Sequence, residues 1–239
     1  FAQNPGGLLD VAAHPRFAEN RLIYLTYAHG TAEANTTRVA RARFTGSALE
    51  GLEVIFESNT PKPATSHFGS RLAWLPDGTL LVSIGDGGNP PTMLDGRLIR
   101  ERAQDPASRL DDDGTAPREA PFAQAAKGVW SIGHRNIQGL AYDPTRDTVW
   151  ATEHGSLGGD ELNRVRAGNN HGWPVVSLTR DYVTAQPIGE ATRRDGMTDP
   201  ALLWDTSVAP SGLTVYTGAA FPQWQGDLFS GSLVSLDVR

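Results

Sequence analysis

A run of polar side chains, Gly133-His134-Arg135-Asn136-Ile137-Gln138, stands directly before a stretch with the character of a buried strand. An arginine beside an asparagine and a glutamine offers a planar fork of donors, which can clamp carboxylate or quinone oxygens. The alternative is a polar loop that only ties two sheets together. These residues by themselves leave both interpretations open.

A second candidate is the glycine-rich stretch from 153 to 163, which contains Gly155, Asp160 and Glu161. Glycines let backbone carbonyls approach a ligand closely, and the two carboxylates add further oxygen donors. About six to eight such oxygens suit Ca²⁺. A plain glycine-rich turn before a strand fits the same residues.

A third candidate is His67, which lies in the sequence Ser66-His67-Phe68-Gly69-Ser70, just before another strand-like run. Histidine side chains ordinarily titrate near pH 6.5, give or take about a unit, so a loop histidine at a strand entrance can act as a general base. A surface histidine without a chemical role is the alternative.

Several other chemistries are excluded by residue type or spacing. The chain has no cysteine, which removes disulfides, thiol catalysis, cysteine-bound zinc and iron–sulfur clusters. The run Asp111-Asp112-Asp113-Gly114 is no EF-hand loop, because its twelfth position is Phe122 instead of glutamate. The sequence contains no H-E-x-x-H, G-x-S-x-G, P-loop or G-x-G-x-x-G motif.

Composition narrows the class of partner. The net charge of −6 argues against nucleic acid and anionic membranes as partners. No apolar run approaches the ~20 residues of a membrane-spanning helix, so we expect no membrane insertion. The N-terminal residues lack the pattern of a signal peptide.

The elements that must position these residues are short strands separated by Gly, Pro, Asn and Asp, a pattern typical of an all-β protein. The strongest strand-like runs are 22–28, 37–44, 80–84, 129–132, 149–152, 213–216 and 228–236. Residues 87–109 are loop-like, with a possible short helix at 98–103.

A weak internal repeat links these strands. Its copies begin at Gly7, Ser70, Gly139 and Gly212, so the intervals are 63, 69 and 73 residues. Paired strands at regular intervals predict the blades of a β-propeller, with long loops because common propeller repeats span only ~40–50 residues. A β-sandwich with coincidental similarity is the alternative.

Five stretches, taken in order and spacing, resemble the glucose/sorbosone dehydrogenase family, whose members are soluble aldose sugar dehydrogenases that use pyrroloquinoline quinone (PQQ). They are 6–15, 67–72 with 84–87, 133–141, 153–174 and 209–213. The resemblance implies a six-bladed β-propeller, of which this chain covers about four blades. We therefore expect residues 1–239 to form a single β-propeller domain that is incomplete at both ends.

The resemblance also implies a site. His67 matches the general base that takes the proton of the sugar's anomeric hydroxyl while hydride passes to PQQ. Arg135 and Asn136 match residues that contact PQQ, and Arg135 also matches the catalytic residue that stabilises negative charge on the reduced quinone oxygen. Asp86 matches a polar residue beneath the cofactor.

The resemblance places Ca²⁺ in two positions. The backbone carbonyls of Gly155 and Ser156 match ligands of the active-site Ca²⁺, and Asp160 matches a position near the waters of that ion. Glu161 and the carbonyl of His171 match ligands of a further, structural Ca²⁺.

The chain departs from the family pattern at particular positions. Pro5 and Pro91 stand where the family often has glutamine, and Val234 stands where it has a cofactor-holding lysine. After Leu110 we expect one strand to be shortened or absent. These departures keep two alternatives open, a non-catalytic propeller module that has lost the cofactor and a Ca²⁺-dependent propeller lactonase.

The resemblance further implies an aldose sugar substrate and an external electron acceptor. It implies a periplasmic or secreted monomer or homodimer.

Overall fold

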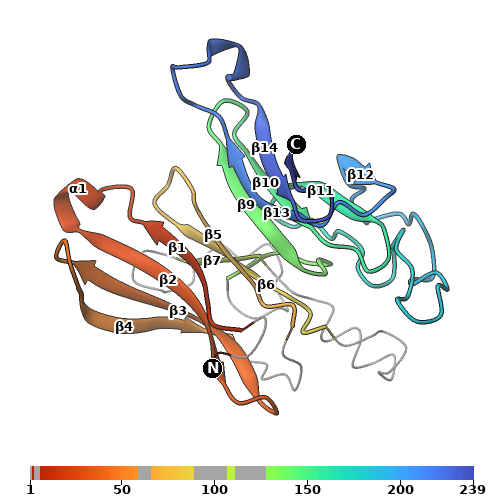
Figure 1. Cartoon of the computed structure of the whole chain (residues 1–239), viewed down its shortest axis with the longest axis horizontal. Coiled ribbons are helices and arrows are strands. Elements are labelled where there is room, and N and C mark those ends of the chain that lie inside the picture. Colours follow the sequence, from red (N-terminus) through yellow and green to blue (C-terminus); the bar gives the residue numbers. More distant parts are fainter. Residues whose placement is uncertain (1, 3–5, 59–65, 89–106, 111–127) are drawn as a thin grey trace.

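The computed structural model describes residues 2, 6–58, 66–88, 107–110 and 128–239, which form four antiparallel sheets (Figure 1). The first sheet contains β1 (Leu8–Ala13), β2 (Leu22–Gly30), β3 (Asn35–Phe44) and β4 (Leu49–Glu57), with the short helix α1 (Phe17–Asn20) between β1 and β2. The second contains β5 (Gly69–Trp74), β6 (Leu80–Ile84), β7 (Ala107–Leu110) and β8 (Val129–Ser131).

The remaining two sheets follow in chain order. The third contains β9 (Ile137–Asp143), β10 (Thr148–Glu153), β11 (Asp160–Val165) and β12 (Leu202–Trp204). The fourth contains β13 (Pro210–Val215), β14 (Leu228–Ser232) and β15 (Asp237–Val238), with a 3-10 helix at Pro222–Trp224 in the β13–β14 connection.

The sheets are the blades of a partial β-propeller, which confirms the predicted fold. Each copy of the repeat coincides with the first strand of a sheet, namely β1, β5, β9 and β13. These first strands pack beside one another in chain order, so successive sheets stand face to face as propeller blades do. The β-sandwich alternative is therefore wrong.

The core lies between the blades because the second sheet is buried on both faces. In β6, Leu80 and Val82 pack toward Tyr24 and Val39 of the first sheet, whereas Leu81 packs with residues of the third sheet. Successive side chains of a strand point to opposite faces. The continuous apolar sequence of β6 is thus explained by a strand with a blade on each side.

Two expectations about strands need correction. The run 228–236 is not one strand: β14 ends at Ser232, and a turn over 233–236 leads into β15. Residues 107–109, which we expected to be loop-like, belong to the strand β7 (Ala107–Leu110). The segment directly after Leu110, where we expected a strand to be shortened or absent, lies outside the described residues, and β8, which is three residues long, completes this sheet. The possible helix at 98–103, the acidic run at 111–113, Pro5 and Pro91 lie outside the described residues.

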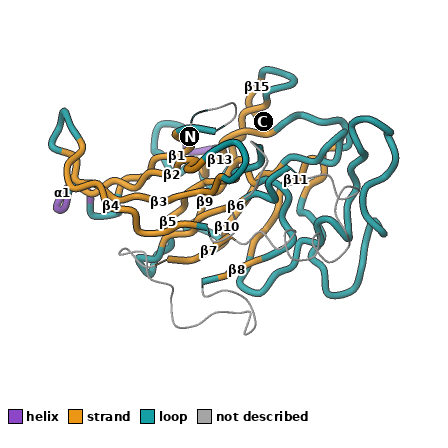
Figure 2. Tube along the Cα trace, turned by 90° about the horizontal axis from the view of Figure 1, so that it is seen from below, coloured by secondary structure: helices purple, strands orange, loops and turns teal. Residues whose placement is uncertain are grey.

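Because neighbouring strands are antiparallel, the first strand of each sheet begins at the end where the second strand finishes. Connecting loops gather at one side of the strands (Figure 2). Within the described ranges, no helix has the length and apolar character needed to cross a bilayer.

Candidate functional site

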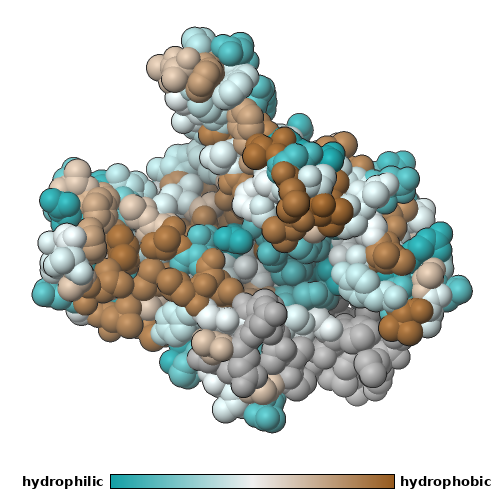
Figure 3. Space-filling view, viewed as in Figure 1, coloured by the Kyte–Doolittle hydropathy of each residue, from teal (hydrophilic) through white to brown (hydrophobic). Residues whose placement is uncertain are grey.

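The predicted site residues converge at one end of the second and third blades. His67 precedes β5 and Asp86 follows β6, while Arg135 and Asn136 precede β9 and Gly155 follows β10. In Figure 3 a hydrophilic hollow lies among apolar surfaces near the centre of the molecule, beside the grey residues. Strand ends from different blades thus bring residues that are distant in sequence into one neighbourhood.

His67 and Asp86 form a hydrogen-bonded pair. The distance from His67 Nδ1 to Asp86 Oδ1 is 2.6 Å. The same carboxylate accepts a hydrogen bond from the backbone N–H of Gly88 at 2.8 Å and one from the indole N–H of Trp173 at 3.0 Å. With its Nδ1 proton directed at a carboxylate, an imidazole carries its lone pair on Nε2, the tautomer that a general base requires.

The backbone around His67 is held in an uncommon conformation. His67 has φ of 53°, in the left-handed region that side chains other than glycine rarely adopt. Gly85 allows the approach of the β6 end, because a Cβ at that position would lie 2.0 Å from the His67 carbonyl oxygen. Such conformations persist where surrounding structure imposes them, and they cluster at functional sites.

Arg135 links this pair to the glycine-rich loop after β10. Its Nη1 donates to the carbonyl oxygens of His154 at 2.9 Å and Gly155 at 2.7 Å. Its guanidinium carbon lies 5.5 Å from the centroid of the Trp173 ring. The backbone carbonyl of Arg135 also accepts a hydrogen bond from the N–H of Asp86 at 3.0 Å. The guanidinium therefore brings positive charge to within the same small volume as the His67–Asp86 pair.

Asn136 is buried beside Arg135 and joins two blades. Its Oδ1 accepts hydrogen bonds from the backbone N–H of Gly69 at 3.3 Å and from the Gln138 side chain at 2.9 Å. Asn136 thereby fixes the start of β5, which directly follows the loop that carries His67.

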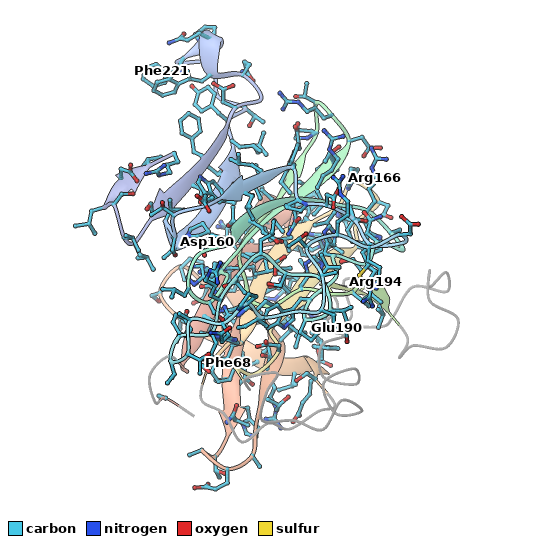
Figure 4. The ribbon with its side chains drawn as sticks, turned by 90° about the vertical axis from the view of Figure 1, so that its right-hand side faces the viewer. Phe68, Asp160, Arg166, Glu190, Arg194 and Phe221 are labelled. Atoms are coloured by element: carbon cyan, nitrogen blue, oxygen red, sulfur yellow. The ribbon has the colours of Figure 1, made fainter. Side chains whose placement is uncertain are left out.

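Asp160 holds the loop of Gly155 and Ser156 against the fourth blade. Its Oδ1 accepts from the Gly155 N–H at 2.9 Å, and its Oδ2 accepts from the Val208 and Ala209 N–H groups at 2.8 and 2.7 Å and from the Ser207 hydroxyl at 2.8 Å. Figure 4 shows Asp160 beside the strands of that blade, with Phe221 at the tip of its projecting hairpin. The Ser156 N–H is fixed separately by the Thr179 hydroxyl at 2.6 Å.

A buried polar network lies next to Arg135. The carboxylate of Glu153 accepts from His134 Nδ1 at 2.9 Å, from the Arg135 N–H at 2.7 Å and from the Asn163 amide at 2.7 Å. The same amide donates to Glu161 at 3.0 Å. Asn163 therefore stands between two carboxylates.

The surroundings of the two carboxylates, Glu153 and Glu161, shift their pKa values in opposite directions. For Glu153, burial favours the neutral form, but the charge and hydrogen bond of His134 outweigh it and lower the pKa to about 2. For Glu161, burial together with the charge of Glu153 raises the pKa to about 8. Burial also lowers the pKa of His171 to about 3, so its ring, stacked 4.5 Å from His134, is neutral.

These residues surround a cavity of about 20 Å³ with the chemistry to hold a cation. Arg135, Glu153, Glu161, His171, Trp173 and Gly155 are among its lining residues. The buried Asn163 Oδ1 has no hydrogen-bond donor within the described part of the chain, and Glu161 is a carboxylate that burial drives toward its neutral form. A volume of this size admits one water-sized occupant, and a cation there would favour the ionised carboxylate.

No group of three or more His, Asp or Glu side chains in the described residues gathers as a metal site. A Ca²⁺ ion here would therefore depend largely on backbone carbonyls and waters, both of which are ordinary Ca²⁺ ligands. The carbonyls of the Gly155 loop are of that donor type, and those of His154 and Gly155 accept hydrogen bonds from Arg135 in this structure.

Comparison with known proteins agrees with this architecture. A family model described as Glucose / Sorbosone dehydrogenase matches residues 1–239. The chain belongs to the glucose/sorbosone dehydrogenase family. An uncharacterized protein of Synechocystis is 58% identical over 100% of this chain and 60% of its own length. The aldose sugar dehydrogenase YliI of Escherichia coli is 34% identical, over 100% of this chain and 65% of its own length. The chain thus spans somewhat less than two thirds of the length of these two relatives.

Solved structures of the family share the fold. The soluble aldose sugar dehydrogenase of Escherichia coli in its apo form superposes with a TM-score of 0.89 at 35% identity, covering 100% of this chain and 70% of that one. The PQQ-bound aldose sugar dehydrogenase of Streptomyces coelicolor superposes with a TM-score of 0.70 at 27% identity, covering 96% of this chain and 60% of that one. The described sheets therefore have the arrangement of a family propeller.

Within this family fold, the predicted residues fall into two groups. His67, Asp86, Arg135 and the Gly155 loop meet directly, whereas Glu161 and His171 lie deeper, around the cavity. Val234 lies apart, 63% exposed in the turn after β14.

Sequence reasoning gave no role to three residues that the structure places within the site, and these are Trp173, Glu153 and Asn163. Each occurs inside a quoted motif, but only the fold reveals its partner.

Proposed function

We propose that the protein oxidises the anomeric hydroxyl of aldose sugars to lactones. The observation that carries this proposal is the His67–Asp86 pair beside the Arg135 guanidinium, in a chain of the glucose/sorbosone dehydrogenase family. Removing hydride from a hydroxyl-bearing carbon requires a base for the hydroxyl proton and positive charge near the hydride acceptor. Solved relatives of this fold include a PQQ-bound aldose sugar dehydrogenase.

His67 serves as the general base in this proposal. Its Nε2 takes the proton of the anomeric hydroxyl as the C1–H bond breaks and the C1–O bond becomes the lactone carbonyl. Asp86, bonded to Nδ1, orients the ring and stabilises the imidazolium that forms. Arg135 stabilises negative charge that develops on the acceptor side.

The residues proposed to hold the cofactor and the ions are those that the family resemblance implies. Arg135, Asn136 and Asp86 would contact PQQ, which when bound accepts the hydride while Ca²⁺ polarises its carbonyl. The carbonyls of Gly155 and Ser156 would hold that Ca²⁺, with Asp160 nearby. Glu161 and the His171 carbonyl would hold the further, structural Ca²⁺.

The two alternatives have less support. A lactonase of this fold would carry its metal on acidic and amide side chains in the central channel. The groove along the inner strands β5, β9 and β13 is instead lined mainly by apolar residues, among them Leu72, Leu140, Tyr142 and Leu213. A non-catalytic module is favoured by the departures at Pro5, Pro91 and Val234, where the family pattern has glutamine or lysine. The electron acceptor in the proposed reaction is external, and the proposed location is periplasmic.

The test is reconstitution of the purified protein with PQQ and Ca²⁺, followed by reduction of an artificial electron acceptor with glucose and other aldoses. His67→Ala is expected to abolish turnover while PQQ binding, measured by the absorbance of the quinone, persists. His29→Ala, on β2 of the first blade, is the matched control and is expected to keep the parent rate. Absence of both turnover and an absorbance change in the parent protein would refute the enzymatic proposal, and full activity of His67→Ala would refute the role of His67.

A further inference from the structure

Trp173 makes contact with both halves of the proposed catalytic apparatus. We propose that Trp173 is a positioning residue that holds the His67–Asp86 pair and the Arg135 guanidinium in fixed relation. The inference deepens the proposed function and rests on it. Trp173 acts through Asp86 and Arg135, and no role in touching the sugar is assigned to it.

The first contact is with the carboxylate of Asp86. One of its oxygens, Oδ1, faces His67 Nδ1 at 2.6 Å and the Gly88 N–H at 2.8 Å. The other, Oδ2, accepts the indole N–H of Trp173 at 3.0 Å. Donors on both oxygens fix the plane of the carboxylate, and with it the orientation of the His67 ring.

The second contact is with Arg135. The guanidinium carbon lies 5.5 Å from the centroid of the Trp173 ring, a distance at which a cation is attracted to the ring face. The carbonyls of His154 and Gly155 hold the same guanidinium through Nη1. The ring therefore restrains Arg135 from another direction than the carbonyls do, and this contact uses none of the N–H donors of the guanidinium.

Trp173 can perform this task because its own backbone is anchored. Its N–H donates to the Gly133 carbonyl at 2.9 Å, and the preceding Gly172 N–H donates to Asn170 Oδ1 at 2.9 Å. Gly133 itself is packed closely, since a Cβ there would lie 2.3 Å from Asn170 Oδ1. The indole thus bridges from the third blade to the end of β6 in the second blade.

The indole N–H also has an electrostatic effect. By donating to Oδ2 it draws off part of the negative charge that Asp86 would otherwise direct at His67. Trp173→Phe keeps an aromatic ring under Arg135 and removes only the donor. The charge on Asp86 then acts more fully on His67 and favours its protonated form.

The decisive experiment follows the titration of His67 by NMR, through its Cε1 proton, in the protein without added cofactor. We expect Trp173→Phe to raise the titration midpoint relative to the parent by about half a pH unit, roughly a threefold change in the protonation equilibrium. Asp86→Asn calibrates the sign, because loss of the carboxylate charge must lower the midpoint. The other charged or titratable groups of this region, Arg135, His154 and Asp160, are unchanged in both variants.

Trp224→Phe is the matched control, since Trp224 lies in the 3-10 helix of the projecting hairpin, and its expected midpoint equals that of the parent. A parent-like midpoint in a folded Trp173→Phe protein, judged by circular dichroism, would overturn the proposal. If that variant does not fold, the tryptophan analogue benzothienylalanine at position 173 keeps the size of the ring, removes only the N–H donor to Asp86 Oδ2, and must raise the midpoint in the same direction. Because the readout needs no turnover, failure of the proposed dehydrogenase activity and failure of this inference are distinguishable.

In the reconstituted enzyme, the Trp173→Phe substitution is expected to lower kcat several-fold and to leave the KM for the sugar unchanged. A change confined to KM would contradict a positioning role. Trp173→Leu removes both the donor and the ring face, so it is expected to lower kcat further than Trp173→Phe. Equal kcat values for the two variants would show that the contact with Arg135 contributes nothing.

Discussion

The buried carboxylate of Asp160 offers a quantitative test of how the glycine-rich loop is held. Asp160 is 1% exposed and accepts four hydrogen bonds, one from the Gly155 N–H on Oδ1 and three from residues 207–209 on Oδ2. Asp160→Asn retains one oxygen and replaces the other by an amide NH₂ group. The least costly orientation keeps the oxygen toward residues 207–209, so the new NH₂ faces the Gly155 N–H.

The size of the destabilisation by Asp160→Asn can be estimated from these hydrogen bonds. A hydrogen bond to a charged group contributes about 1.5–3 kcal/mol, and a buried donor left without an acceptor costs about 1–3 kcal/mol. We therefore expect Asp160→Asn to lower the free energy of unfolding by about 3 kcal/mol. That is a large fraction of the roughly 5–15 kcal/mol typical of a folded domain.

The assay is urea unfolding in EDTA and again in excess Ca²⁺. Asp181→Asn is the matched control, because Asp181 accepts three hydrogen bonds in a solvent-exposed turn where water can replace them, and we expect little change there. A loss of less than about 1 kcal/mol for Asp160→Asn would refute the reasoning. The loss is expected in EDTA as well as in Ca²⁺, since the hydrogen bonds do not depend on the metal; a loss seen only with Ca²⁺ would assign Asp160 to the ion instead.

Three further predictions follow from the site. Burial and the charge of Glu153 raise the pKa of Glu161 from 4.5 to about 8. The unfolded chain therefore releases this proton at a lower pH than the folded protein, and the metal-free protein loses stability as pH rises from about 4.5 to 8. In EDTA at pH 8, Glu161→Gln is therefore expected to have a higher urea midpoint than the parent, and a parent-like pH dependence would contradict this. In excess Ca²⁺, the variant is expected to lack the stabilisation that the parent gains from the ion. Burial lowers the pKa of His171 to about 3. In the unfolded chain this histidine takes up a proton below about pH 6.5, so the stability of the folded protein falls as pH drops from 6.5 toward 3. His171→Phe is expected to flatten that part of the stability profile, and an unchanged acid limb would count against a buried neutral ring. Gly85→Ala places a Cβ 2.0 Å from the His67 carbonyl and is expected to lower kcat at least tenfold, whereas Gly212→Ala, with no atom within 4 Å of its new Cβ, is not; equal rates would show that the β6 end can yield.

The arrangement of the blades could be predicted because its signal is local. The repeat starts at Gly7, Ser70, Gly139 and Gly212 mark the first strand of each sheet, and turn residues separate the strands. Run 228–236 was wrongly predicted as one strand because its apolar residues continue through the turn. Leu233, Val234 and Leu236 are all exposed there, so hydrophobicity alone does not indicate a strand.

The site could be predicted only in pieces. His67, Arg135 and Gly155 were each identified from their own stretch of sequence, but their contacts depend on how the second and third blades stack. Trp173 and Asp86 are 87 positions apart, and no spacing rule joins an indole to a carboxylate over that distance. Glu153 was missed for a related reason. It ends a fully buried strand, where a carboxylate is unexpected until His134 and the Arg135 N–H are placed beside it.

The glycine-rich loop shows how a site built from backbone groups would be marked in a sequence. Acidic and histidine side chains form no metal-binding cluster among the described residues, yet the glycine pattern predicted a carbonyl site there. A Cβ at Gly155 would lie 2.0 Å from the Gly158 carbonyl oxygen, so the turn that presents the Gly155 carbonyl requires glycine. Ligands supplied by the backbone leave no side chain to recognise, and their sequence signal is the residue that permits the turn. The carboxylate of Asp160 then acts on that turn through the Gly155 N–H, which makes the position of the Gly155 carbonyl sensitive to a residue that lies behind the turn.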